Sequence, residues 1–126
     1  MDGKVKVVTF INADCSSCIE DLKEWTLFVN KADMNKVRFI FLIRSNYGNT
    51  TFENLNTNKI DFDLPYFYDN NDSLFTLNKI SEDKLFQTFL LDEQNKVKLI
   101  GNPIGHKRLS DLYLKEIQQT IKDSIE

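Results

Sequence analysis

The sequence is poor in cysteine and histidine, with two cysteines and one histidine in 126 residues. Two cysteines are too few for a scaffold built from disulfides, so a hydrophobic core must stabilise the fold. A zinc site needs about four ligands, and a single histidine leaves few candidates for one. The role of the cysteines therefore has to be judged from their spacing and surroundings.

Long apolar runs and basic runs are also missing. No stretch approaches the ~20 apolar residues that span a membrane, and the opening MDGKVKVV lacks the apolar region of a signal peptide. The net charge is −3, with acidic and basic residues interleaved, which argues against a nucleic-acid backbone as a partner. We therefore expect no membrane-spanning segment in this chain and no nucleic-acid partner.

The composition that remains is that of an ordinary soluble globular protein, with 41% hydrophobic and 28% charged residues. A length of 126 residues suits one hydrophobic core. The sequence shows no internal repeat, linker or low-complexity block. We expect residues 1–126 to form a single domain.

The first third of the chain has a clear pattern. Residues 5–11 form a nearly continuous apolar run, typical of a strand that is covered on both faces. Within residues 18–29 the apolar side chains recur at the spacing of one helix face, and residues 36–45 are a second buried strand. These elements predict a β-α-β unit over residues 5–44.

Turn residues and weaker periodicity indicate the remaining elements. We expect a short helix within 50–57, a strand over 65–69, a helix over 70–80, a hairpin over 86–101 around DEQN, and an amphipathic helix from Lys107 to the end. The predicted fold class is α/β, with a central mixed β-sheet flanked by helices and a β-α element inserted in the middle.

Cys15 and Cys18 form a C-x-x-C pair at the junction between the first strand and the first helix. The unpaired N–H groups and the dipole of a helix N-terminus stabilise a thiolate, which is the nucleophilic form of cysteine. Spacing alone is a weak signal, but this spacing inside a β-α-β unit is a strong one. We interpret Cys15 as the attacking thiol and Cys18 as the resolving thiol.

Three other interpretations of the pair remain open. A zinc site would have to recruit His106, which lies 88 residues beyond Cys18. A structural disulfide would close a tiny loop and constrain little of the unfolded chain. The two thiols would have no redox role if both were buried and inert.

The segments KVKVVTFINADCSSC, LPYFYDNNDSLF and TFLLDEQNKVKLIG resemble the thioredoxin-like superfamily, and in particular its TlpA- and ResA-type extracytoplasmic thiol:disulfide oxidoreductases. The chain end is similar to short thioredoxin-like proteins of Bacteroidetes. The resemblance implies a thioredoxin-like fold and a Cys15–Cys18 dithiol that needs no metal or organic cofactor. It implies protein thiol or disulfide substrates, an unidentified redox partner, and an extracytoplasmic location, either periplasmic or membrane-anchored in the precursor.

Three positions depart from the family pattern. Asp14 replaces a tryptophan, and its carboxylate either opposes thiolate formation or caps the helix. Thr9 replaces a buried acid that assists proton transfer, while Glu20 and Asp21 are expected to be solvated. Phe86 or Gln87 stands where the family has a cis-proline that faces the dithiol. A trans peptide bond is expected there, because a cis bond without proline costs about 2.5–4 kcal/mol.

The resemblance also implies which residues contact the substrate beside the dithiol. They are Asp14, Ser16 and Ser17 around the cysteines, and Phe86 and Gln87 in the facing loop. The three departures favour an alternative function, a thioredoxin-fold binding or redox-sensing module with little catalytic turnover.

Overall fold

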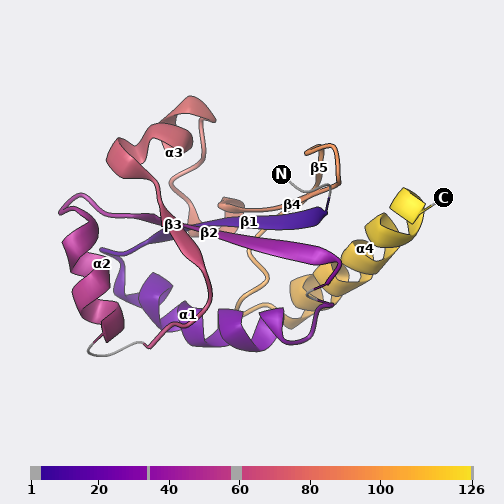
Figure 1. Cartoon of the computed structure of the whole chain (residues 1–126), viewed down its shortest axis with the longest axis horizontal. Coiled ribbons are helices and arrows are strands. Elements are labelled where there is room, and N and C mark those ends of the chain that lie inside the picture. The colour runs from indigo at the N-terminus through magenta and orange to yellow at the C-terminus, as the bar shows by residue number, and fades with distance from the viewer. Residues whose placement is uncertain (1–3, 34, 58–60, 126) are drawn as a thin grey trace.

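The computed structural model describes residues 4–33, 35–57 and 61–125. The elements are, in chain order, β1 (Val5–Asn12), α1 (Ser16–Val29), β2 (Val37–Arg44), α2 (Asn49–Leu55), β3 (Tyr66–Tyr68), the 3-10 helix η2 (Asn70–Asp72), α3 (Ser73–Leu77), the 3-10 helix η3 (Lys84–Phe86), β4 (Thr88–Leu91), β5 (Val97–Ile100) and α4 (Lys107–Ile125). The strands form one sheet in the order β3-β2-β1-β4-β5. Figure 1 shows α1 and α4 on one side of this sheet and α3 on the other. The predicted α/β class, with a mixed sheet and an inserted β-α element, is confirmed.

Strand β1 occupies the centre of the sheet. It pairs with β2 in parallel, with Val5 opposite Val37. On its other edge it pairs with β4 in the antiparallel direction, with Thr9 opposite Thr88. Most of its residues are buried, because helices cover both faces of the sheet, and this explains the continuous apolar run in the sequence.

The larger core lies between the sheet and helices α1 and α4. Helix α1 turns Leu22, Trp25 and Phe28 toward the sheet. Trp25 is fully buried and meets the rings of Phe28 and Phe41 edge to face, with ring centroids 5.7 and 5.5 Å apart. Phe28 also meets Tyr113 of α4 at 6.3 Å. These contacts fix the axis of α1, and therefore the position of its N-terminus.

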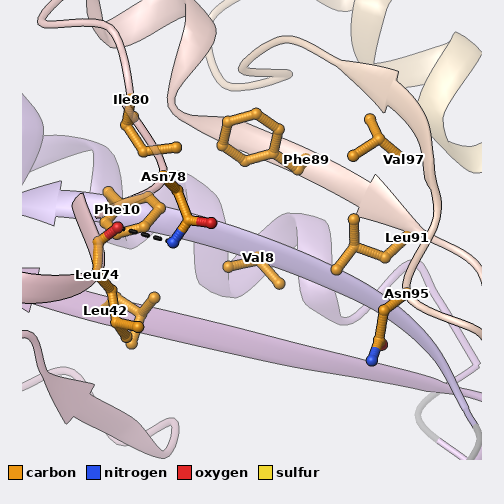
Figure 2. Close-up of a pocket in the computed structure, with 10 residues that line it drawn as sticks. All are labelled: Val8, Phe10, Leu42, Leu74, Asn78, Ile80, Phe89, Leu91, Asn95 and Val97. Atoms are coloured by element: carbon orange, nitrogen blue, oxygen red, sulfur yellow. Dashed lines mark hydrogen bonds between the residues drawn. The ribbon is translucent and has the colours of Figure 1, made fainter. Parts of the chain in front are cut away.

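A smaller core lies on the opposite face of the sheet, where Phe10 and Phe75 pack edge to face at 5.6 Å. Apolar side chains of β1, β4 and α3 line a hollow of about 400 Å³ on this face, and Asn78 donates a hydrogen bond to the Leu74 carbonyl at its rim (Figure 2). The hollow lies on the side of the sheet that faces away from α1, so it is separate from the cysteines.

The helix expected over 70–80 is shorter than predicted. Asn71 and Asp72, which lie within η2, have positive φ values of 59° and 53°. These left-handed residues separate η2 from the α-helix that follows. Helix α3 then begins at Ser73, and the Asp69 carboxylate accepts two N–H groups of its first turn at 2.8 and 2.9 Å. The sequence therefore predicts the turn residues before the helix, but it does not predict that two of them have a left-handed backbone.

The hairpin expected over 86–101 begins two residues later, at Thr88, because Phe86 belongs to η3. Its turn is closed by Asp92, whose carboxylate accepts the Lys96 N–H at 2.9 Å. This N–H makes the largest contribution to holding the pKa of Asp92 below its usual value. The predicted position of the turn is confirmed.

Thr88 joins three elements at the start of β4. Its hydroxyl and that of Thr9 share a buried hydrogen bond of 2.8 Å. Its carbonyl accepts the Gly101 N–H at 2.9 Å and the Tyr113 hydroxyl at 3.2 Å. Burial raises the pKa of Tyr113, so this hydroxyl stays a neutral donor. Together these bonds fix the position of Gln87, the residue before β4.

We predict that Thr9→Val and Thr88→Val each lower the free energy of unfolding by about 1–3 kcal/mol, because each leaves one buried hydroxyl without its partner. The double variant is expected to be close to the wild type, since it removes both polar groups and keeps the side-chain shape. Urea denaturation followed by far-ultraviolet circular dichroism measures all four proteins. A loss in the double variant equal to the sum of the single losses would contradict the shared bond.

Candidate functional site

The two cysteines lie where β1 ends and α1 begins. The Asn12 carbonyl accepts the N–H of Cys15 at 3.1 Å, which closes a turn between the strand and the helix. Cys15 is the N-cap residue of α1, and its carbonyl accepts the N–H of Ile19 at 3.1 Å. The sulfurs of Cys15 and Cys18 are joined as a disulfide, with Cα atoms 5.2 Å apart. The pair is thus at the strand-to-helix junction that the sequence predicted.

The two sulfurs differ in exposure and in hydrogen bonding. Cys18 is only 6% exposed, whereas Cys15 is partly accessible. The N–H of Cys18 donates to the sulfur of Cys15 at 3.3 Å, and the Ser17 hydroxyl lies 3.3 Å from the same sulfur. Ser16, the first residue of α1, is exposed. The donors and the helix dipole favour negative charge on Cys15, the sulfur that solvent and a substrate can reach.

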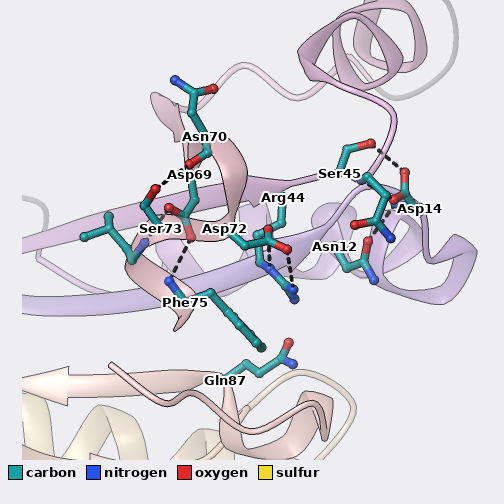
Figure 3. A network of polar contacts seen from close by, with 12 residues as sticks. Asn12, Asp14, Arg44, Ser45, Asp69, Asn70, Asp72, Ser73, Phe75 and Gln87 are labelled. Atoms are coloured by element: carbon teal, nitrogen blue, oxygen red, sulfur yellow. Dashed lines mark hydrogen bonds and ion pairs between the residues drawn. The ribbon is translucent and has the colours of Figure 1, made fainter. Parts of the chain in front are cut away.

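Asp14 does not cap α1, so the alternative that it serves as the helix cap is wrong; Cys15 takes that position. The Asp14 carboxylate instead accepts the Ser45 hydroxyl at 2.7 Å and the Asn46 N–H at 2.8 Å. Figure 3 shows Asp14 pointing toward Ser45, in the loop that follows β2. Asp14 therefore ties the cysteine turn to the neighbouring loop.

The end of β2 is bonded to the cysteine turn. The Arg44 carbonyl accepts the Ala13 N–H at 2.7 Å. The Arg44 side chain makes two bonds to the Asp72 carboxylate, at 3.1 and 3.3 Å, and its guanidinium lies 3.4 Å from the centre of the Phe75 ring (Figure 3). The loops at this edge of the sheet are thereby held together by charged and aromatic contacts.

No carboxylate from β1 lies at the position of the family's buried acid. Thr9 is buried there, and its hydroxyl is occupied by Thr88. Asp21 was expected to be solvated, but it is only partly exposed and its carboxylate pairs with Lys84 at 2.8 Å. Glu20 is exposed as expected. The ion pair with Lys84 joins α1 to η3.

The loop that contains Phe86 and Gln87 lies against both elements that carry the dithiol. The Gln87 carbonyl accepts the N–H of Phe10 in β1 at 3.0 Å, and Lys84 in the same loop binds Asp21 of α1. No peptide bond among the described residues is cis, so the predicted trans bond at Phe86 and Gln87 is confirmed. Gln87 is buried and Phe86 is exposed. Their roles in substrate binding stay a prediction.

Sequence reasoning missed several residues of this site. Asp83 is the residue before η3, and its carboxylate accepts the Leu85 N–H at 3.0 Å. Aspartate is a preferred residue at a helix start, so the sequence carried a signal for this cap. The partners of Asp14 and of Asp21 carried no such signal, because they lie 31 to 63 residues away in the chain.

Within the described ranges, no group of three or more His, Cys, Asp or Glu side chains is placed to hold a metal ion. In the same part of the chain, no helix combines the length and the apolar character required to cross a membrane.

The fold is found in several solved structures. StoA from Bacillus subtilis is 17% identical, with 90% of this chain and 84% of that chain covered and a TM-score of 0.70. The exposed lipoprotein thioredoxin Etrx1 from Streptococcus pneumoniae is 16% identical, with 91% and 86% covered and a TM-score of 0.69. A secreted thiol-disulfide isomerase from Corynebacterium glutamicum is 13% identical, with 93% and 72% covered and a TM-score of 0.71.

The comparisons by sequence add nothing to this likeness, since neither a family profile nor a curated protein matches the chain. Identities of 13–17% establish the fold and leave the activity to be argued from the site. The chain has the thioredoxin-like fold, which an exposed lipoprotein thioredoxin and a secreted thiol-disulfide isomerase share.

Proposed function

We propose that this protein is a thiol:disulfide oxidoreductase that acts on protein substrates through Cys15 and Cys18. The single observation that carries the proposal is the placement of the pair. A partly accessible sulfur at a helix N-terminus is bonded to a buried sulfur one helical turn further on. This arrangement lets one sulfur meet a substrate and keeps the other available only to its neighbour.

The reaction starts from the reduced dithiol. The Cys15 thiolate attacks one sulfur of a substrate disulfide, forms a mixed disulfide and releases the other substrate sulfur as a thiolate, which takes up a proton from water. Cys18 loses its proton to water and attacks the Cys15 sulfur. The second substrate sulfur leaves as a thiolate and takes up a proton from water, and the Cys15–Cys18 bond forms. The substrate gains two electrons, and a dithiol reductant must return them to the protein; the reverse sequence oxidises a substrate dithiol.

The location of this work is also proposed from the comparisons. One structural neighbour is described as a secreted protein and another as an exposed lipoprotein. An oxidising compartment suits a dithiol that exchanges with protein disulfides. We infer that this chain acts outside the cytoplasm, as the sequence resemblance implies.

A second candidate function is a thioredoxin-fold binding or redox-sensing module with little turnover. Two observations favour it. Thr9 supplies no carboxylate for the deprotonation of Cys18, and the Phe86 N–H is already bonded to the Asp83 carbonyl at 2.9 Å. A module of this kind would form its disulfide but would exchange slowly with protein substrates.

An insulin-reduction assay coupled to a small thiol reductant separates the two functions. The wild type is expected to accelerate the reaction, and Cys15→Ser is expected to return it to the rate of the reductant alone, because the attacking thiolate is gone. Cys18→Ser is the matched control. It keeps the nucleophile and is expected to accumulate a mixed disulfide that mass spectrometry detects. A wild type no faster than Cys15→Ser would reject the oxidoreductase.

Asp14 should tune the reactivity of Cys15. We predict that Asp14→Asn lowers the pKa of the reduced Cys15 thiol, because it removes a neighbouring negative charge and keeps an oxygen for the loop contacts. Alkylation of Cys15 by iodoacetamide at neutral pH is expected to become about two- to fivefold faster, with a smaller difference at high salt.

Asp123→Asn is the control for this experiment. Asp123 is an exposed carboxylate in the last turns of α4, far along the chain from the cysteine turn. This variant is expected to alkylate at the wild-type rate. Equal rates for all three proteins, or slower alkylation of Asp14→Asn, would show that Asp14 does not act on Cys15 through its charge.

A further inference from the structure

The side of the sheet that carries α3 has a raised part and a low part. Helix α3 is five residues long, and Figure 1 shows it near the end of β1, with β5 toward the opposite end of the sheet. The hollow of about 400 Å³ lies beside α3. Figure 2 shows Leu74 of α3 on one side of the hollow, Val97 at the start of β5 on the other, and Val8 of β1 between them.

Leu77 projects from the raised part of this surface. Its side chain is 79% exposed, whereas Phe75 is 5% exposed and packs against Phe10 of β1. Residues two apart in an α-helix point about 200° apart around the helix axis. Because Phe75 faces the sheet, Leu77 faces away from it. The surface therefore carries an apolar projection and an apolar hollow side by side.

The two walls of the hollow are open to water. Leu74 is 43% exposed and Val97 is 52% exposed, and Ile100 in the same strand as Val97 is 50% exposed. Sites for small molecules cover roughly 70–90% of the ligand, which walls as open as these do not achieve. A contiguous apolar surface of this kind is typical of contact with another protein.

The lining of the hollow carries no charged side chain among the described residues. It is apolar apart from Asn78 and Asn95, although 28% of the sequence is charged. In a contact between two identical copies around a two-fold axis, the same patch is present on both sides. A charge near that axis would meet its like, which opposes association. A neutral lining therefore suits a second copy of this chain better than a partner that is recognised by its charge.

The extent of this face fits a small interface between two copies. The five strands lie about 4.8 Å apart, and the eight residues of β1 rise about 3.3 Å each, so the face measures roughly 20 Å by 26 Å. Its flat footprint is at most about 500 Å², whereas a standard interface buries about 800 Å² on each partner. Insertion of a projection into a hollow adds area to this footprint. Such a contact supports a reversible dimer with a Kd on the order of 100 μM.

We infer that two copies of this chain associate through this face as a two-fold dimer, in which Leu77 of each copy enters the hollow of the other. A two-fold axis forms both contacts at once, because the projection and the hollow are neighbours on one surface. The inference does not depend on the proposed oxidoreductase function. Cys15 and Cys18 stay outside the contact, since they lie at the start of α1 on the other side of the sheet.

Sedimentation velocity of the full chain in reducing buffer tests the dimer, with protein from about 10 μM to about 1 mM. The reductant prevents dimers that are linked through the cysteines. The wild type is expected to shift from monomer to dimer over this range. Leu77→Glu is expected to weaken association at least about tenfold, because it places a charge in an apolar contact. Leu27→Glu is the matched control, since Leu27 is 63% exposed on α1, and it is expected to associate like the wild type.

A mixture of two variants tests whether the projection of one copy meets the hollow of the other. Val97→Lys alone is expected to weaken association about as much as Leu77→Glu. An equimolar mixture of the two is expected to associate within about threefold of the wild type. In the mixed dimer the introduced carboxylate meets the introduced ammonium, and the other half of the contact is unchanged. Thermal unfolding confirms that each variant is folded at the temperature of the experiment.

A wild type that stays monomeric at every concentration would overturn the dimer. Saturable binding of dodecanoate by such a monomer, measured by calorimetry, would assign the hollow to a small apolar ligand instead. Wild-type association of Leu77→Glu, or an equal loss in Leu27→Glu, would show that the contact lies elsewhere. A mixture of Leu77→Glu and Val97→Lys that associates no better than either variant alone would refute the insertion of Leu77 into the hollow.

Discussion

Strand β1 constrains both halves of the candidate site through its hydrogen-bonded edges. On one edge, parallel pairing with β2 leads to the Ala13 contact with the end of β2, which supports the cysteine turn. On the other edge, pairing with β4 brings Gln87 onto Phe10. The pairing of β1 with β2 and with β4 therefore positions both the cysteine turn and Gln87.

Opposing electrostatic effects meet at Cys15. The helix dipole, the Cys18 N–H and the Ser17 hydroxyl favour a thiolate. We predict that the charge of the neighbouring Asp14 carboxylate, which the Ser45 and Asn46 contacts hold in place, disfavours it. In such balanced surroundings a smaller fraction of the thiol is present as thiolate at neutral pH than the helix alone would produce. The sulfur is then also a poorer leaving group.

The loop that contains Phe86 and Gln87 has a closed backbone. A cis-proline keeps a backbone extended and its polar groups open, whereas η3 folds that backbone on itself and presents side chains. Gln87 is bonded to Ser81 and to β1, so it holds the loop by hydrogen bonds where proline would hold it by its ring. The closed backbone is compatible with both proposed functions, an oxidoreductase and a module that exchanges slowly.

Local patterns in the sequence were sufficient for β1, α1 and β2 and for the position of Cys15 and Cys18. Continuous apolar runs specify buried strands, and helical spacing specifies α1, because both depend only on nearby residues. The partners of Asp14 and Asp21 were decided by the tertiary structure. The ion pair of Asp21 with Lys84 joins residues 63 apart, and the Asp14 carboxylate binds Ser45 and Asn46 in the loop after β2 while Cys15 caps α1. The sequence by itself determined where the dithiol is, and local bonds close the turn of η3, whereas the contacts of Asp14 and the ion pair that ties η3 to α1 arise only when distant segments are brought into contact.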